Sequence, residues 1–99
     1  MKIPKKLIKL SKNDRGTLIE RALKLNEEAG EVAEASLRLA GRKNNKGRKK
    51  ADMRLHVVEE AIDTIIMGFD ILAHMKFTNE SDIDTLIRLK LEKWEKAVS

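Results

Sequence analysis

The chain has 99 residues, with 21 Lys and Arg against 16 Asp and Glu, and a net charge of +5. A chain of this length forms one domain with a modest core, and the absence of Cys excludes a disulfide framework. No apolar run reaches the ~18–20 residues of a transmembrane helix, and the Lys-rich start lacks the apolar segment of a signal peptide. We therefore expect a soluble, cytoplasmic protein, with a loosely held leader at 1–12 and one domain at 13–99.

The first long helix is predicted over 14–40. Ser11, Asn13 or Asp14 is expected to cap its beginning, because short polar side chains accept hydrogen bonds from the free N–H groups there. Gly41 suits the position that follows its end. Between these limits, apolar residues recur at the spacing of one helix face, at Leu18, Ala22, Leu25, Ala29, Val32, Ala33 and Ala40.

Two more helices follow, so the sequence predicts an all-α fold built as a small helical bundle. One is expected over 51–75, with apolar residues at Leu55, Val58, Ile62, Ile65, Ile66, Phe69, Leu72 and Ala73. The other is expected over 82–97, and Ser81 with Asp84 resembles a capping box at its beginning. Because the helix over 51–75 is apolar around more of its circumference than two neighbours can cover, we expect self-association to complete the bundle.

Two pairs of carboxylates stand out. Glu28 and Glu31 are three residues apart on the first helix, as are Glu60 and Asp63 on the second, so each pair projects to one side of its helix. Four carboxylates brought together repel one another and raise one another's pKa values, and a divalent cation relieves this repulsion. Mg²⁺ is bound by one or two carboxylates, waters and substrate phosphates. The pattern therefore indicates a site for a metal ion and a phosphorylated ligand.

The helical wheel supports these residues unequally. Glu28 falls beside the apolar stripe of the first helix, whereas Glu31 lies further round. On the second helix, Glu59 and Asp63 fall nearer the apolar face than Glu60. From the residues alone, Glu59 therefore competes with Glu60 as a ligand.

The order Glu-x-x-Glu (28–31), a spacer of 28 residues, and Glu-x-x-Asp (60–63) resembles the all-α nucleoside triphosphate pyrophosphohydrolases of the MazG and dCTP pyrophosphatase type. The resemblance covers the chain from about Leu18 to Trp94. It implies a homodimer or homotetramer in which Glu28, Glu31, Glu60 and Asp63 hold Mg²⁺, for which Mn²⁺ would substitute. It also implies hydrolysis of a nucleoside triphosphate to a monophosphate and pyrophosphate, which would clean the nucleotide pool.

Basic residues would then contact the phosphates of the substrate. The segment around Lys90 and Lys93 is similar to the ending of the family, so the resemblance implies Lys93, and second Lys90, as phosphate ligands. Arg42 and Lys46, in the basic run 42–50, would steady the leaving pyrophosphate. Glu59 or Glu27 would accept the proton of the attacking water.

Two other classes of function remain open. The run 42–50 also suits a basic helical module that binds nucleic acid, whose affinity would fall steeply with salt. A non-catalytic assembly protein would use the acidic residues only as a solvated face. The chain contains no Ser–His or Cys–His pair for nucleophilic catalysis and no Gly-rich phosphate-binding loop, so metal-activated water is the expected route for a hydrolase.

Overall fold

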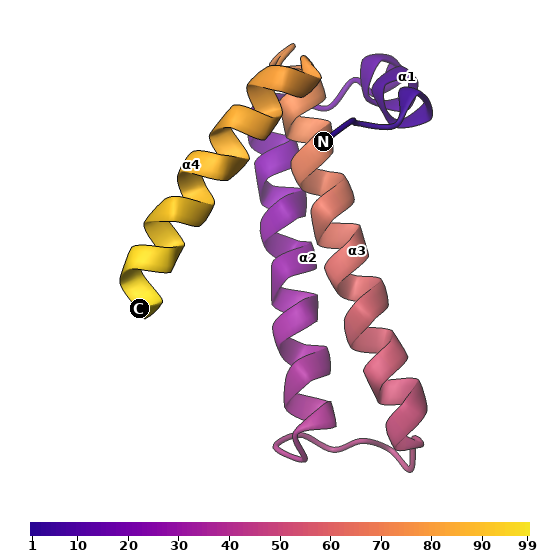
Figure 1. Cartoon of the computed structure of the whole chain (residues 1–99). Coiled ribbons are helices and arrows are strands. Elements are labelled where there is room, and N and C mark those ends of the chain that lie inside the picture. Colours follow the sequence, from indigo (N-terminus) through magenta and orange to yellow (C-terminus); the bar gives the residue numbers. More distant parts are fainter.

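The computed structural model describes all of residues 1–99 as four helices without a strand: α1 (Lys5–Asn13), α2 (Leu18–Leu39), α3 (Lys50–His74) and α4 (Glu80–Val98). The all-α prediction is confirmed, and the three expected helices are present with ends that differ by at most four residues. Figure 1 shows α2 and α3 side by side as an antiparallel hairpin, with α1 near one end of it and α4 leaning away. None of these helices has the length and apolar composition needed to span a bilayer.

The interface between α2 and α3 is built from regularly spaced positions. On α2 the buried and half-buried residues follow the spacing of one face, at Arg21, Leu25, Glu28, Val32 and Ala35. On α3 the corresponding residues are Met53, Val57, Glu60, Thr64 and Met67. Both stripes repeat every three or four residues, as helix packing requires. Small and polar side chains thus occupy much of this interface, and the carboxylates Glu28 and Glu60 are among them.

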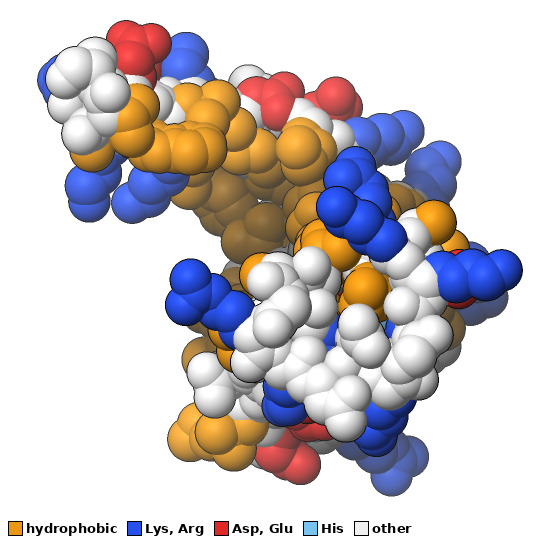
Figure 2. Space-filling view, turned by 90° about the horizontal axis from the view of Figure 1, so that it is seen from below, with side chains coloured by type: hydrophobic (Ala, Val, Ile, Leu, Met, Phe, Trp, Pro, Cys, Tyr) orange, Lys and Arg blue, Asp and Glu red, His pale blue; other side chains and the backbone are white.

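The most apolar face of α3 does not point toward α2. Five of its large side chains are each at least 40% exposed, namely Leu55, Val58, Ile62, Ile65 and Ile66. On α4, Leu86, Leu89, Leu91 and Trp94 are exposed as well. Figure 2 shows hydrophobic side chains along α4, which protrudes from the molecule, and in the recess between α4 and the hairpin. Only six of the 99 residues are buried, so the apolar surface of this chain is largely uncovered.

The beginning of the chain differs from its prediction. Residues 1–12 were expected to form a loosely held leader, but most of them belong to α1, which packs against α3, and Ile3 is 2% exposed. A nine-residue helix is marginal in isolation, so its short Lys-rich pattern gave little signal. The helix exists because α3 supplies a surface for it.

The caps of α2 and α4 also differ from prediction. Thr17 caps α2 instead of Ser11, Asn13 or Asp14. Its Oγ1 accepts from the Glu20 N–H at 3.2 Å, and Glu20 Oε1 accepts from the Thr17 N–H at 3.0 Å. At α4 the cap is Asn79, which accepts from the Asp82 N–H at 3.0 Å, so Ser81 lies inside the helix.

A buried guanidinium joins three helices. Arg21 of α2 is 6% exposed, and all five of its N–H groups are used. It donates to Asp70 Oδ1 of α3, to the Ser11 side chain at 3.1 Å and to the Ser11 carbonyl at 3.2 Å. It also donates to the carbonyls of Asp14, at 2.9 Å, and Gly16, at 2.8 Å. Arg21 therefore fixes the end of α1 and the α1–α2 connection to the hairpin.

Replacing Arg21 by Met is expected to destabilise the fold by about 3–5 kcal/mol, because it leaves the Asp70 carboxylate and several carbonyls without a partner. Urea denaturation followed by circular dichroism measures this loss. The matched control is Arg88→Met, which breaks an exposed pair with Glu92 on α4 and is expected to cost less than about 1 kcal/mol. Equal effects of the two substitutions would contradict the central role of Arg21.

Candidate metal centre

The candidate centre lies in the middle of the α2–α3 interface. The side chains of Glu28 and Glu60 are only 12% and 13% exposed, and each occupies a position of its helix that faces the other helix. Carboxylates are rarely this buried unless a partner compensates their charge. Their place in the interface is therefore a chemical feature that requires an explanation.

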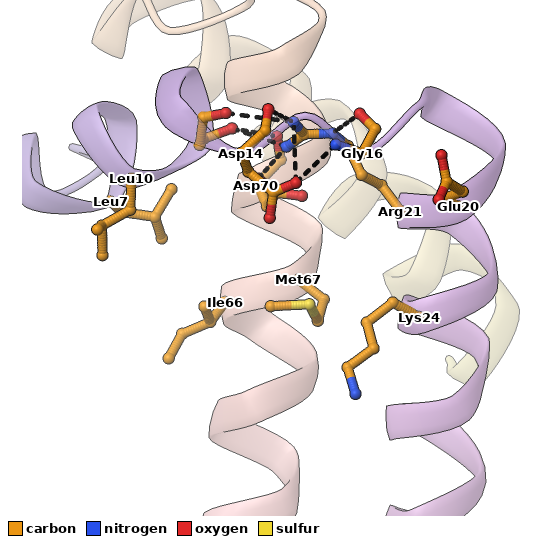
Figure 3. A pocket seen from close by; sticks show the side chains of 11 residues that line it. Leu7, Leu10, Asp14, Gly16, Glu20, Arg21, Lys24, Ile66, Met67 and Asp70 are labelled. Atoms are coloured by element: carbon orange, nitrogen blue, oxygen red, sulfur yellow. Dashed lines mark hydrogen bonds and ion pairs between the residues drawn. The ribbon is translucent and has the colours of Figure 1, made fainter.

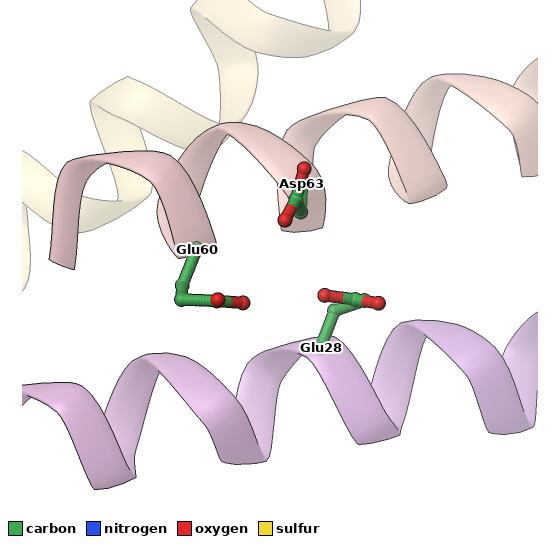
Figure 4. A group of neighbouring side chains, drawn as sticks. All are labelled: Glu28, Glu60 and Asp63. Carbon is green, nitrogen blue, oxygen red and sulfur yellow. The ribbon is translucent and has the colours of Figure 1, made fainter. Parts of the chain in front are cut away.

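Three of the four predicted carboxylates converge. One oxygen each from Glu28, Glu60 and Asp63 lies within 4.8 Å of the others, as Figure 4 shows. Glu60 and Asp63 are three residues apart on α3 and so share a side, and Glu28 approaches them from α2. This arrangement gives oxygen ligands from two helices around one point, and we refer to these three residues as the acidic cluster.

The fourth carboxylate, Glu31, lies beside Glu60. Contact with the Glu60 carboxylate is the main reason that the pKa of Glu31 is raised, and repulsion by the Glu60 charge acts in the same direction. The folded chain therefore holds this proton more tightly than the unfolded chain. Its contribution to stability is present at low pH and is lost as the pH rises through the raised pKa.

A divalent cation fits the donor set. Glu60 Oε2 is buried without a hydrogen-bond partner, and Glu60 Oε1 is 3.8 Å from His56 Nδ1. A buried carboxylate oxygen with no donor is costly, and the other two members of the cluster, Glu28 and Asp63, are themselves acceptors. Hard cations such as Mg²⁺ and Mn²⁺ prefer oxygen ligands of this kind. A cation bound by these residues would give the unpartnered Glu60 oxygen a positive partner. The same cation would remove the repulsion among the three carboxylates.

Glu59, the rival of Glu60, is exposed and stands outside the cluster. The helical wheel had placed it nearer the core because that wheel was centred on the bulkiest apolar residues of α3. The structure turns a different face of α3, with Val57, Glu60 and Thr64, toward α2. The order of burial of Glu59 and Glu60 is consequently the reverse of the wheel's.

The predicted phosphate ligands are not gathered at the cluster within one chain. Arg42 and Lys46 lie in the connection between α2 and α3, which ends where α3 begins at Lys50. Glu60 is ten residues further along α3, so about 15 Å of helix separates it from this connection. Lys90 and Lys93 are exposed on α4, no Cα of which lies within 8 Å of a Cα in another helix. In a single chain, these four residues therefore form no common site with the carboxylates.

Lys24 lies beside the cluster and was not among the predicted site residues. Its Nζ is 3.4 Å from Glu28 Oε1 and 3.7 Å from Glu27 Oε1. The charge of Glu27 and then contact with Glu28 raise the pKa of Lys24, so its ammonium group stays charged. Its position four residues before Glu28 was a usable signal, since such residues share a helix face.

Comparison with known proteins gives no relative for this chain, because no protein-family model matches it and no match was found among curated proteins or solved structures.

In metal-free solution at neutral pH, Glu60→Gln is expected to raise Tm above that of the unchanged protein, because it removes a charge from the cluster. Below the ordinary pKa of glutamate the difference in Tm between the two proteins should vanish. Glu31 is then protonated in both proteins, so it no longer repels the side chain at position 60. Mg²⁺ at about 100 times its Kd would stabilise the unchanged protein by about 2.7 kcal/mol. Thermal unfolding with and without Mg²⁺ measures both effects.

The control is Glu59→Gln, one residue away on the exposed side of α3. It should leave both the metal-free Tm and the Mg²⁺ response near those of the unchanged protein. An equal Mg²⁺ response in Glu60→Gln would show that the cluster does not bind the ion.

Proposed function

We propose that this protein is a divalent-metal-dependent nucleoside triphosphate pyrophosphohydrolase, acting on free nucleotides of the cytoplasm. The observation that carries the proposal is the convergence of Glu28, Glu60 and Asp63 within 4.8 Å, with a buried oxygen of Glu60 lacking a donor. The resemblance of their order and spacing to the MazG and dCTP pyrophosphatase type supplies the reaction. Glu28, Glu31, Glu60 and Asp63 would hold Mg²⁺ or Mn²⁺.

The reaction is hydrolysis of the α–β anhydride bond. Water attacks the α-phosphorus, the α–β bond breaks, pyrophosphate leaves and a nucleoside monophosphate remains. When bound, the metal ion would neutralise phosphate charge and lower the pKa of a coordinated water. The chain's own contribution is to hold the triphosphate beside the carboxylates, and Lys24, whose ammonium already lies 3.4 Å from Glu28, is the nearest basic group for this task.

Purified protein incubated with a panel of NTPs and dNTPs is expected to release pyrophosphate only when Mg²⁺ is present. Glu60→Gln, Glu31→Gln and Asp63→Asn should each lower kcat by about 100-fold or more, as the loss of an electrostatic contact to a transition state does. Glu59→Gln is the matched control and should retain activity. An enzyme-coupled pyrophosphate assay measures the rates.

Absence of release with every nucleotide would overturn the proposal. If the protein then bound DNA or RNA with an affinity that falls steeply as salt increases, the basic segment 42–50 would carry the function instead.

Self-association is the second part of the proposal. The exposed apolar side chains of α3 and α4 are too many for a stable monomer surface, and burial of each large one contributes about 1.5–3 kcal/mol. A second copy that covers α3 in a dimer, or a pair of dimers in a tetramer, would complete the bundle. It would also offer Lys90, Lys93, Arg42 and Lys46 to the cluster of its neighbour, which these residues do not reach within their own chain.

Ile62→Glu is expected to shift the protein from dimer or tetramer toward monomer, because it places a charge in the middle of the exposed face of α3. Sedimentation velocity measures the distribution of species. Ile19→Glu on α2, whose side chain is 72% exposed, is the control and should leave the distribution unchanged. A protein that is monomeric at micromolar concentration before any substitution would contradict the proposal.

A further inference from the structure

A cavity of about 380 Å³ lies where α1 meets the α2–α3 hairpin. Its volume is within the range of about 300–1,000 Å³ that is typical of small-molecule sites. Figure 3 shows Leu7 and Leu10 of α1 on one side, Ile66 and Met67 of α3 below, and Lys24 of α2 opposite. Three helices therefore contribute walls to one concave site.

The cavity adjoins the acidic cluster. Lys24 lines the cavity and is one helical turn before Glu28, to which its Nζ is 3.4 Å. Met67 lines it as well and is one turn after Asp63. One turn of an α-helix rises about 5.4 Å. A ligand with its phosphates at the cluster would accordingly place its remaining part in this cavity.

The walls of the cavity suit a flat apolar group. Leu10 and Ile66 are 59% and 40% exposed, and both line the cavity with Met67 and Leu7. Apolar side chains from two helices, α1 and α3, thus border one space and offer apolar contact to a ring placed there. Covering such exposed side chains is favourable in proportion to the area removed from water.

The polar groups of the cavity accept hydrogen bonds. Arg21 lines it, but all five of its N–H groups already have partners. Asp14 is 63% exposed and accepts one hydrogen bond from the Gly16 N–H at 2.7 Å, which leaves most of its acceptor capacity free. Asp70 and Glu20 add further carboxylates. Lys24 is the exception as a donor, and the remaining polar groups of the cavity therefore favour a ligand edge that donates hydrogen bonds.

We propose that this cavity binds the nucleoside of the substrate, and that it prefers a base with an exocyclic amino group, as in cytosine, adenine and guanine, over uracil and thymine. The inference rests on the proposed function, because the acidic cluster is what would hold the phosphates. The base lies between Leu10 and Ile66 and donates its amino N–H to Asp14. The sugar lies beside Lys24.

Titration of methyl-labelled protein with CMP and UMP in the presence of Mg²⁺ tests this inference by NMR. The two nucleotides share the sugar, the phosphate and the ring size and differ in the group that faces Asp14. CMP is expected to shift the methyl signals of Leu10 and Met67 and to bind about tenfold or more tightly than UMP, since a hydrogen bond to a charged group is involved. The methyl signals of Leu86 on α4 serve as an internal reference.

Asp14→Asn separates this inference from a purely structural role of Asp14. The amide oxygen of Asn still accepts from the Gly16 N–H, while its NH₂ group donates to the uracil carbonyl. The ratio of the two Kd values is therefore expected to fall to about threefold or less. Asp52→Asn, on an exposed position of the first turn of α3, should keep the ratio.

The possible outcomes separate the two proposals. If triphosphates are hydrolysed but CMP leaves Leu10 and Met67 unshifted, or Asp14→Asn keeps the preference, this inference is overturned and the proposed function stands. Equal affinity for CMP and UMP in the unchanged protein overturns it as well. If CMP binds at these methyl groups with the expected preference and no triphosphate is hydrolysed, the hydrolase proposal fails and the cavity remains a nucleotide-binding site.

Discussion

The contact of Arg21 with Asp70 and the α1–α2 connection is the constraint on which the rest of this small structure depends. With only six buried residues, the chain has little apolar core to fix the relative positions of its helices. The planar guanidinium instead joins α1, α2 and α3 through five directional hydrogen bonds. Because these bonds fix the hairpin at one end, the spacing of α2 and α3 one and two turns further along is set as well.

That spacing matters for the acidic cluster. Glu28 and Glu60 occupy positions where a two-helix interface would gain more stability from Leu or Val. An interface that keeps carboxylates there holds their mutual repulsion in the metal-free state, and the raised pKa of Glu31 reflects it. Such a cost is common at ligand sites, where local stability is given up for binding. The rigid contact at Arg21 makes this cost tolerable.

The sequence alone predicted the helices that are long and strongly periodic, together with the carboxylate pairs, because both depend on spacing along one helix. It failed where contacts distant in the chain decide the outcome. The α1 helix is stabilised by α3, and Ser11 is buried beneath Arg21 rather than used as a cap. The rotation of α3 could not be read from its most apolar face, because that face is turned away from α2. Arg21 itself stood on the stripe of Leu25 and Glu28, and a basic residue at such a position was a signal for a buried ion pair.

The end of α3 has a consequence for α4. The Lys76 backbone adopts φ 59°, the left-handed conformation that ends a helix, and the Phe77 N–H donates to the Leu72 carbonyl at 2.9 Å. A lysine in this conformation is held against its intrinsic preference. The first turn of α4 is also held by contacts, because Ile83 is 3% exposed and Asp84 forms an ion pair with the Met1 ammonium group. The beginning of α4 is accordingly preorganised. Its orientation is set before any neighbour arrives, and association loses less conformational entropy than the docking of a freely hinged helix would.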